Sequence, residues 1–138
     1  MNDVLRHAAE EFLQQLRAAW DAGDARAYAA KFTDDATYVI FLGEVLLGRE
    51  EIERNHIEVF ARWRKGKKMA VKAIEVHSLG ADVGSVLTVG GIGTEAVIPY
   101  DKIQTFTLVR RGAGWLCAAF QNTAMSEPAK VVFNAPPS

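Results

Sequence analysis

A histidine stands where acid–base chemistry could occur. Ile52, His56, Val59, Phe60 and Trp63 recur at the spacing of one helical face, so His56 points to the same side as the apolar residues. An imidazole titrates near neutral pH and is costly to bury without a hydrogen-bond partner. His56 is therefore either a core histidine bonded to a neighbour, or an acid, base or ligand contact that faces a cavity. The sequence leaves both readings open.

Further polar side chains lie in segments that otherwise read as apolar strands. Tyr38 and Gln104 each stand in such a segment, and Gln121 and Asn122 share another. Because successive side chains of a strand point to opposite faces, one of these last two amides must lie on the covered side of a half-buried sheet. Such groups are either structural hydrogen-bonding partners or the polar contacts of a small-molecule pocket. The predicted aromatic lining of that pocket is Trp20, Phe60 and Trp63.

Three helices, one hairpin and a run of strands are expected to position these side chains. The expected helices are about 3–22, a short one capped by Asp24 that runs through Tyr28 and Phe32, and one after Gly48. The expected strands are 36–42, 45–47, 69–79, 82–89, 100–110 and 114–125. This order predicts an α+β fold, in which a curved antiparallel sheet wraps around the N-terminal helices.

Length and composition bound the class of protein. With 138 residues we expect one domain, at 1–125, followed by a tail at 126–138 that is flexible or docks on a neighbour. Sixteen basic and 17 acidic residues create no global field for nucleic acid or an anionic membrane. The single Cys117 excludes an internal disulfide and predicts a buried, inert thiol in a cytoplasmic protein. No apolar run approaches the ~18 residues that a membrane span needs.

Neither a nucleotide nor a metal is expected. Gly91-Ile92-Gly93 starts like a dinucleotide fingerprint, but the chain then enters another strand, so no helix N-terminus would face a pyrophosphate. Glu53 precedes His56 with the spacing of carboxylate-bridged di-iron bundles, yet such sites need two copies and further glutamates. We therefore predict no cofactor and no metal.

Several short motifs together resemble a known fold family. They are Trp20-Asp21-Ala22-Gly23-Asp24, Phe32-Thr33-Asp34-Asp35-Ala36-Thr37-Tyr38, Gly48-Arg49-Glu50-Glu51-Ile52, Gly114-Trp115 and Phe120-Gln121-Asn122-Thr123. Over residues 5–124 the chain resembles the nuclear transport factor 2-like, cystatin-like α+β cone. It looks most like the SgcJ/EcaC-type branch, related to the SnoaL-like polyketide cyclases and ketosteroid isomerases. This cone hosts isomerases, dehydratases, cyclases and proteins without catalysis, so the resemblance concerns fold more than activity.

The resemblance also indicates what is missing. The general base of ketosteroid isomerases corresponds to Ile40, and their oxyanion tyrosine corresponds to Leu16, so steroid-isomerase chemistry is not supported. What remains is a cavity for a small, mainly apolar molecule. In it, His56 and Tyr38 would be the catalytic residues of a cofactor-free dehydration, cyclisation or isomerisation, with Gln104 and Asn122 among the binding residues. The alternative is a non-catalytic ligand-binding or scaffold protein. A homodimer through the sheet faces is expected.

Overall fold

The computed structural model describes residues 3–136. The helices are α1 (Asp3–Ala22), α2 (Ala25–Ala29), α3 (Arg49–Val59) and α4 (Glu127–Asn134), and a π-helical turn η1 (Phe60–Arg64) continues α3. The strands are β1 (Phe32–Val39), β2 (Val45–Leu47), β3 (Lys68–Gly80), β4 (Val83–Gly93), β5 (Lys102–Arg111) and β6 (Gly114–Ala124).

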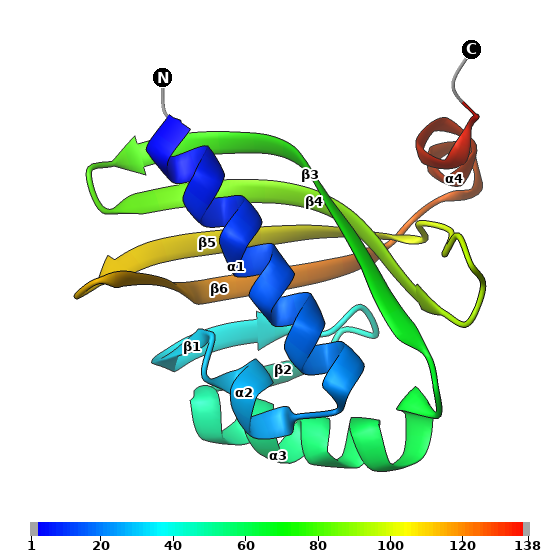
Figure 1. The fold of residues 1–138 in the computed structure, drawn as a ribbon, viewed down its shortest axis with the longest axis horizontal. Helices are drawn as coiled ribbons and strands as arrows, with labels where there is room; N and C mark the ends of the chain where they lie inside the picture. The colour runs from blue at the N-terminus through cyan, green and yellow to red at the C-terminus, as the bar shows by residue number, and fades with distance from the viewer. Residues whose placement is uncertain (1–2, 137–138) are drawn as a thin grey trace.

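The strands form one open, curved, six-stranded sheet in the order β2-β1-β6-β5-β4-β3 (Figure 1). Neighbouring strands are antiparallel except β1 and β6, which run parallel. α1 crosses one face of the sheet, and α3 packs against the β1–β2 end of the same face (Figure 1). We call this covered face the inner face. The predicted α+β architecture, a curved sheet wrapped around N-terminal helices, is confirmed.

The apolar stripe of α1 is the first half of the core. Its buried residues follow the helical period: Leu5, Ala9, Phe12, Leu13, Leu16, Ala19 and Trp20. Gly23 ends the helix with φ 69°, a left-handed conformation that disfavours other residues. A Cβ at Gly23 would lie 2.8 Å from Nε of Arg64, whose long side chain could shift, so it is the backbone conformation that favours glycine at this corner.

Aromatic and branched residues of the inner face form the other half of the core. Val86, Phe106 and Phe120 come from three adjacent strands and are buried. The rings of Phe106 and Phe120 lie 4.8 Å apart, and that of Tyr38 lies 4.5 Å from Phe120. Such close ring contacts bury large apolar areas, so the middle of the inner face is well packed.

The first strand starts earlier than predicted. α2 ends at Ala29, and Phe32 belongs to β1 rather than to the short helix. Phe32 is fully buried and pairs with Cys117 of β6, and the Cys117 amide donates to the Lys31 carbonyl over 2.8 Å. The pairing then shifts between Phe32 and Thr37. Pairing with a distant strand therefore outweighs the local helical pattern here.

A bulge in β6 corrects the predicted alternation of its faces. Simple alternation would put Cys117 and Gln121 on one face and Phe120 and Asn122 on the other. Instead Leu108 pairs with Cys117 while Thr107 pairs with Ala119, so one extra residue sits in β6. Cys117, Phe120 and Asn122 therefore share the inner face, and Gln121 is exposed on the other face.

The prediction that Trp63 points inward is wrong. α3 continues into the π-helical turn η1, and Trp63 is 68% exposed. A π turn closes i→i+5 hydrogen bonds and holds more residues per turn, so the side chains that follow leave the α-helical stripe. Ile52 and His56, which precede the turn, are buried as the stripe predicts. Phe60, at its start, packs against Trp20 at 4.7 Å between ring centroids.

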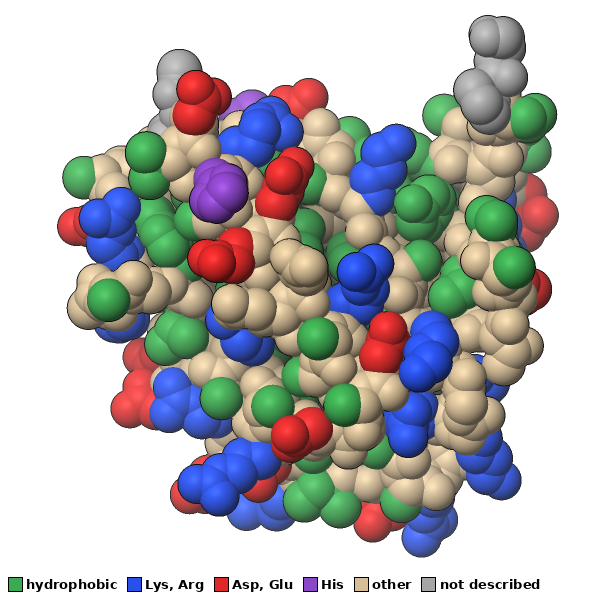
Figure 2. Space-filling model, in the orientation of Figure 1, with side chains coloured by type: hydrophobic (Ala, Val, Ile, Leu, Met, Phe, Trp, Pro, Cys, Tyr) green, Lys and Arg blue, Asp and Glu red, His purple; other side chains and the backbone are tan. Residues whose placement is uncertain are grey.

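The C-terminal segment forms a short helix beside the loop between β4 and β5. The Ser126 side chain caps α4 by accepting from the Ala129 amide. The Asn134 side chain accepts from the Tyr100 amide and donates to the Tyr100 carbonyl, each over 2.8 Å. Figure 2 shows hydrophobic side chains around this helix. None of the helices within residues 3–136 is long and apolar enough to cross a membrane.

Candidate functional site

A buried chain of hydrogen bonds joins α2, β1 and α3. The hydroxyls of Tyr28 and Tyr38 lie 2.8 Å apart, and the Tyr38 hydroxyl lies 3.2 Å from His56 Nε2. His56 Nδ1 lies 2.7 Å from the Ile52 carbonyl, which can only accept, so Nδ1 carries the proton. In the neutral imidazole Nε2 then accepts from the Tyr38 hydroxyl, and the Tyr38 oxygen accepts from Tyr28.

This chain is enclosed by aromatic rings. His56 is only 7% exposed, and its ring lies 4.3 Å from that of Tyr28 and 5.7 Å from that of Phe60. Burial lowers the pKa of His56 from 6.5 to about 4, although its bond to the Ile52 carbonyl raises it. Burial likewise raises the pKa values of Tyr28 and Tyr38. All three side chains are therefore neutral at physiological pH.

The three hydrogen-bonded side chains do not readily gain or lose a proton near neutral pH. A general base works best when its pKa lies near the working pH, and that of His56 lies well below neutrality. Both ring nitrogens already have partners within the protein. The arrangement therefore fixes one tautomer and ties three elements together. It can pass a proton only if a substrate reaches Tyr38 or Tyr28.

A second polar group crosses the sheet on the inner face. Thr88 of β4 pairs with Gln104 of β5, and Gln104 pairs with Asn122 of β6. The Thr88 hydroxyl donates to Gln104 Oε1 over 2.7 Å. Asn122 Oδ1 is buried without a hydrogen-bond partner. We call these three side chains the amide row.

Apolar residues flank the amide row, and this part of the inner face is more open. Ala73 pairs with Thr88 at one end, and Ile40 comes level with Asn122 at the other, since Val39 pairs with Gln121. Ala73, Ile40, Gln104 and Asn122 are half-buried, whereas the core beside them is closed. Gln104 and Asn122 thus lie on a half-open apolar wall, whereas Thr88 is fully buried.

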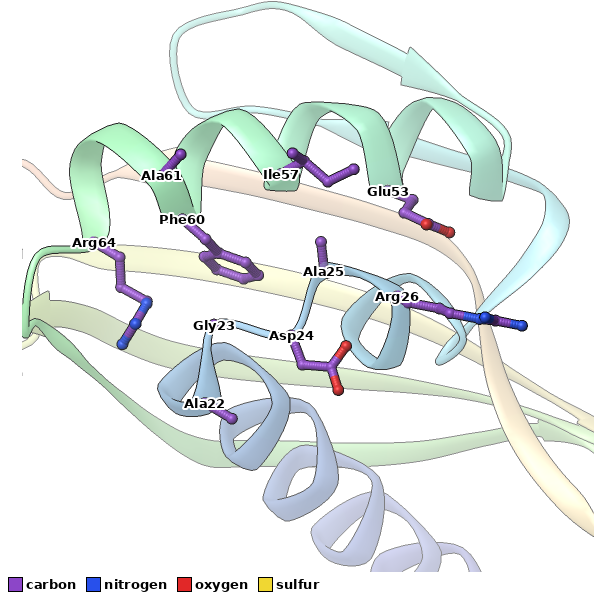
Figure 3. A pocket seen from close by; sticks show the side chains of 10 residues that line it. All are labelled: Ala22, Gly23, Asp24, Ala25, Arg26, Glu53, Ile57, Phe60, Ala61 and Arg64. Carbon is purple, nitrogen blue, oxygen red and sulfur yellow. The ribbon is translucent and has the colours of Figure 1, made fainter.

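The hollow drawn in Figure 3 lies elsewhere, between the α1–α2 corner and α3. This open groove of about 620 Å³ is lined by Ala22, Gly23, Asp24, Ala25, Arg26, Glu53, Ile57, Phe60, Ala61 and Arg64. Arg64 lies at one end and Arg26 and Glu53 at the other (Figure 3). Asp24 caps α2, and Arg64 Nη1 donates to the Asp21 carbonyl over 3.0 Å. The charged side chains of the groove are mixed in sign, and some already form hydrogen bonds within the protein, so the groove favours neither an anionic nor a cationic ligand.

Electrostatics single out no metal or polyanion site. Figure 2 shows acidic and basic side chains interspersed over the face drawn there, in line with a formal charge of −1. Within residues 3–136, no group of three or more His, Cys, Asp or Glu side chains is placed to hold a metal ion. Cys117 is buried and donates to the Ala119 carbonyl, and burial raises its pKa to about 12, so it is a poor nucleophile.

The sequence-predicted site residues fall into three groups. Trp20, Tyr38 and His56 are buried in the core, next to Phe60. Gln104 and Asn122 lie on the half-open wall. Trp63 is exposed on the outside. Sequence reasoning missed two participants, Tyr28 and Thr88. The sequence pattern could have indicated Thr88, because it is a polar residue that follows Gly84 and Val86 on the same side of its strand. Tyr28 had none, since its contact with Tyr38 depends on how a helix packs on a strand.

Comparison with known proteins concerns the fold. No protein-family model matches the sequence, and a search of curated proteins finds no match either. Solved structures match along most of both chains. A domain of unknown function with a cystatin-like fold from Nostoc punctiforme is 22% identical, with a TM-score of 0.81, and the match covers 96% of this chain and 85% of that one.

Two further structures carry names of activities. A ketosteroid isomerase-like protein from Erwinia carotovora atroseptica is 21% identical over 91% of this chain and 99% of its own, with a TM-score of 0.69. A protein from Novosphingobium aromaticivorans, named as a candidate scytalone dehydratase, is 17% identical over 91% and 87%, with a TM-score of 0.78. The resemblance to the SgcJ/EcaC-type branch stays a prediction. At these identities the likeness shows the fold alone, and the chain has the cystatin-like, nuclear transport factor 2-like fold.

Proposed function

We propose that this protein binds a small, mainly apolar molecule against the half-open part of the inner face, with Gln104 and Asn122 as polar contacts. The observation that carries the proposal is the amide row on an apolar wall, in which Asn122 Oδ1 is buried and unpaired. Small-molecule sites are mostly apolar surfaces with a few convergent polar groups, and this wall has that character. Similar folds whose names refer to isomerases and dehydratases are consistent with it.

Blocking the wall tests this function. Ala73→Phe would add a ring on the inner face beside Thr88, whereas Lys72→Phe adds the same ring on the other face. We expect calorimetry with planar, weakly polar compounds to give binding to the wild type and to Lys72→Phe, and none to Ala73→Phe. Nucleotides serve as negative controls, and melting curves verify that both variants fold. Equal binding by the two variants, or no binding by the wild type, would reject the proposal.

A cofactor-free lyase or isomerase is the second candidate function. The Tyr28–Tyr38–His56 chain favours it, because Tyr38 could exchange a proton with a ligand while His56 Nε2 stays 3.2 Å behind it. Its test follows a bound compound by NMR during long incubation. Conversion by the wild type, and its loss in Tyr38→Phe, would support catalysis. A bound ligand that is recovered unchanged leaves only the binding function.

A further inference from the structure

The side-chain oxygen of Asn122 is buried and has no hydrogen-bond partner within residues 3–136. A buried carbonyl-type oxygen without a donor is uncommon in folded proteins and is costly. Two other buried polar atoms lack hydrogen bonds, but Asp101 Oδ1 lies 3.1 Å from the Lys102 ammonium, and Arg64 Nε lies against Gly23. Among residues 3–136, Asn122 alone presents such an atom on the half-open wall.

The neighbouring amide of Gln104 is held in one orientation. Thr88 is fully buried, so its hydroxyl hydrogen needs an acceptor, and Gln104 Oε1 accepts it over 2.7 Å. The Gln104 amide also lies over Gly90, where a Cβ would come within 3.0 Å of both of its polar atoms. In this orientation the Nε2 hydrogens of Gln104 have no hydrogen-bond partner within residues 3–136. Gln104 therefore offers a donor, and Thr88 acts as its positioning residue.

Gln104 and Asn122 stand directly opposite each other on β5 and β6, so a free donor lies beside a free acceptor. We propose that this pair recognises a ligand group that accepts from Gln104 and donates to Asn122, namely an alcohol or phenol hydroxyl or a primary amide. This inference rests on the binding function proposed above. An ether can accept but not donate. A carboxylate would direct negative charge at Asn122 Oδ1.

The nearest cation does not change this preference. Lys102 is next to Gln104 on the same face of β5, and its ammonium lies 3.1 Å from Asp101 Oδ1 and 4.5 Å from the centroid of the Phe41 ring. Its charge is thus already paired within the protein. An anionic ligand would have to displace Asp101, whereas a neutral hydroxyl leaves the pair intact.

Three probes that share a naphthalene ring system test the inference: 2-naphthol, 2-methoxynaphthalene and 2-naphthoate, titrated by calorimetry. The ether cannot donate the hydrogen bond to Asn122 Oδ1 that 2-naphthol can donate. Since such a bond contributes about 1 kcal/mol, we expect 2-naphthol to bind about fivefold to tenfold more tightly than the ether. The naphthoate should bind more weakly than 2-naphthol. Asn122→Leu should abolish the preference for the hydroxyl, and Thr88→Val, which frees the Gln104 amide, should reduce it.

Matched controls lie on the other face of the same strands. Gln121→Leu and Thr105→Val change exposed side chains next to the tested positions, and both should keep the wild-type preference. If Asn122→Leu does not fold, Thr88→Val and the probe series on the wild type still decide. Equal affinity for the naphthol and the ether, or a preference that survives Asn122→Leu, overturns the inference while leaving the binding function intact. No binding of any probe rejects both.

Discussion

Mild acid should destabilise this protein through His56. Burial lowers the folded-state pKa of His56 from 6.5 to about 4. Between pH 6.5 and about 4, His56 is therefore protonated in the unfolded protein but stays neutral in the folded protein. The stability from neutral His56 is therefore fully present above pH 6.5, and it is lost as the pH falls toward 4.

The structure sets the size of this effect. Because one pKa unit corresponds to about 1.4 kcal/mol, the complete loss amounts to roughly 3 kcal/mol, of which about 2 kcal/mol is lost by pH 5. The side chains that face the imidazole are Tyr28 and Tyr38, both neutral, together with Phe60. No ion pair to His56 exists among the described residues that could retain the proton.

Urea unfolding at about pH 7.5 and about pH 5 measures the loss. Wild type should lose about 2 kcal/mol more than His56→Gln, since the titration of carboxylates is common to both proteins. His7→Gln, which changes an exposed histidine of α1, serves as the control variant. NMR of the imidazole should give a midpoint near 4. A midpoint near 6.5, or an equal loss in His56→Gln, would refute the buried neutral assignment.

Three further expectations concern packing and assembly. Tyr38→Phe leaves the Tyr28 hydroxyl and His56 Nε2 without partners, so the free energy of unfolding should fall by about 1–3 kcal/mol. Urea titration beside the wild type measures this fall, and an unchanged value would contradict the Tyr28–Tyr38–His56 hydrogen bonds. Trp63→Ala should cost under about 0.5 kcal/mol and Trp20→Ala about 3–5 kcal/mol, and similar costs would contradict the assigned burial. Light scattering should give a mass of about twice 15.2 kDa, because the outer sheet face carries apolar residues such as Leu87 that a homodimer would cover. Leu87→Glu should halve that mass, and a monomeric wild type would exclude the dimer.

Regular elements were predictable because their periods are written in the sequence. α1 repeats its apolar stripe over several turns, and the long strands β3 to β6 alternate between turns rich in glycine. The irregular steps were not predictable. The π turn that turns Trp63 outward and the bulge that brings Cys117 and Asn122 to one face both alter a period at a single point. A pattern read over several residues does not reveal such a single-point change.

For the candidate site, single residues could be picked from the sequence, but their contacts with one another could not. The period of α3 predicts that His56 points inward, and Tyr38 was noted as a polar side chain in a strand, but only packing reveals their contact and Tyr28 as the third member. The same holds for the amide row. Gln104 stood out as polar in an apolar strand, while the role of Thr88 depends on strand register.

Free hydrogen-bonding capacity separates the two readings of His56 that the sequence left open. A side chain that acts on a ligand must have a donor or acceptor that the fold itself does not use. Both imidazole nitrogens are taken, by Ile52 and Tyr38, and the lowered pKa keeps the ring neutral, so His56 serves the fold first. Gln104 and Asn122 retain unused groups on a half-open apolar wall. In the function proposed here recognition is therefore assigned to the amides, and any chemistry by His56 must pass through Tyr38.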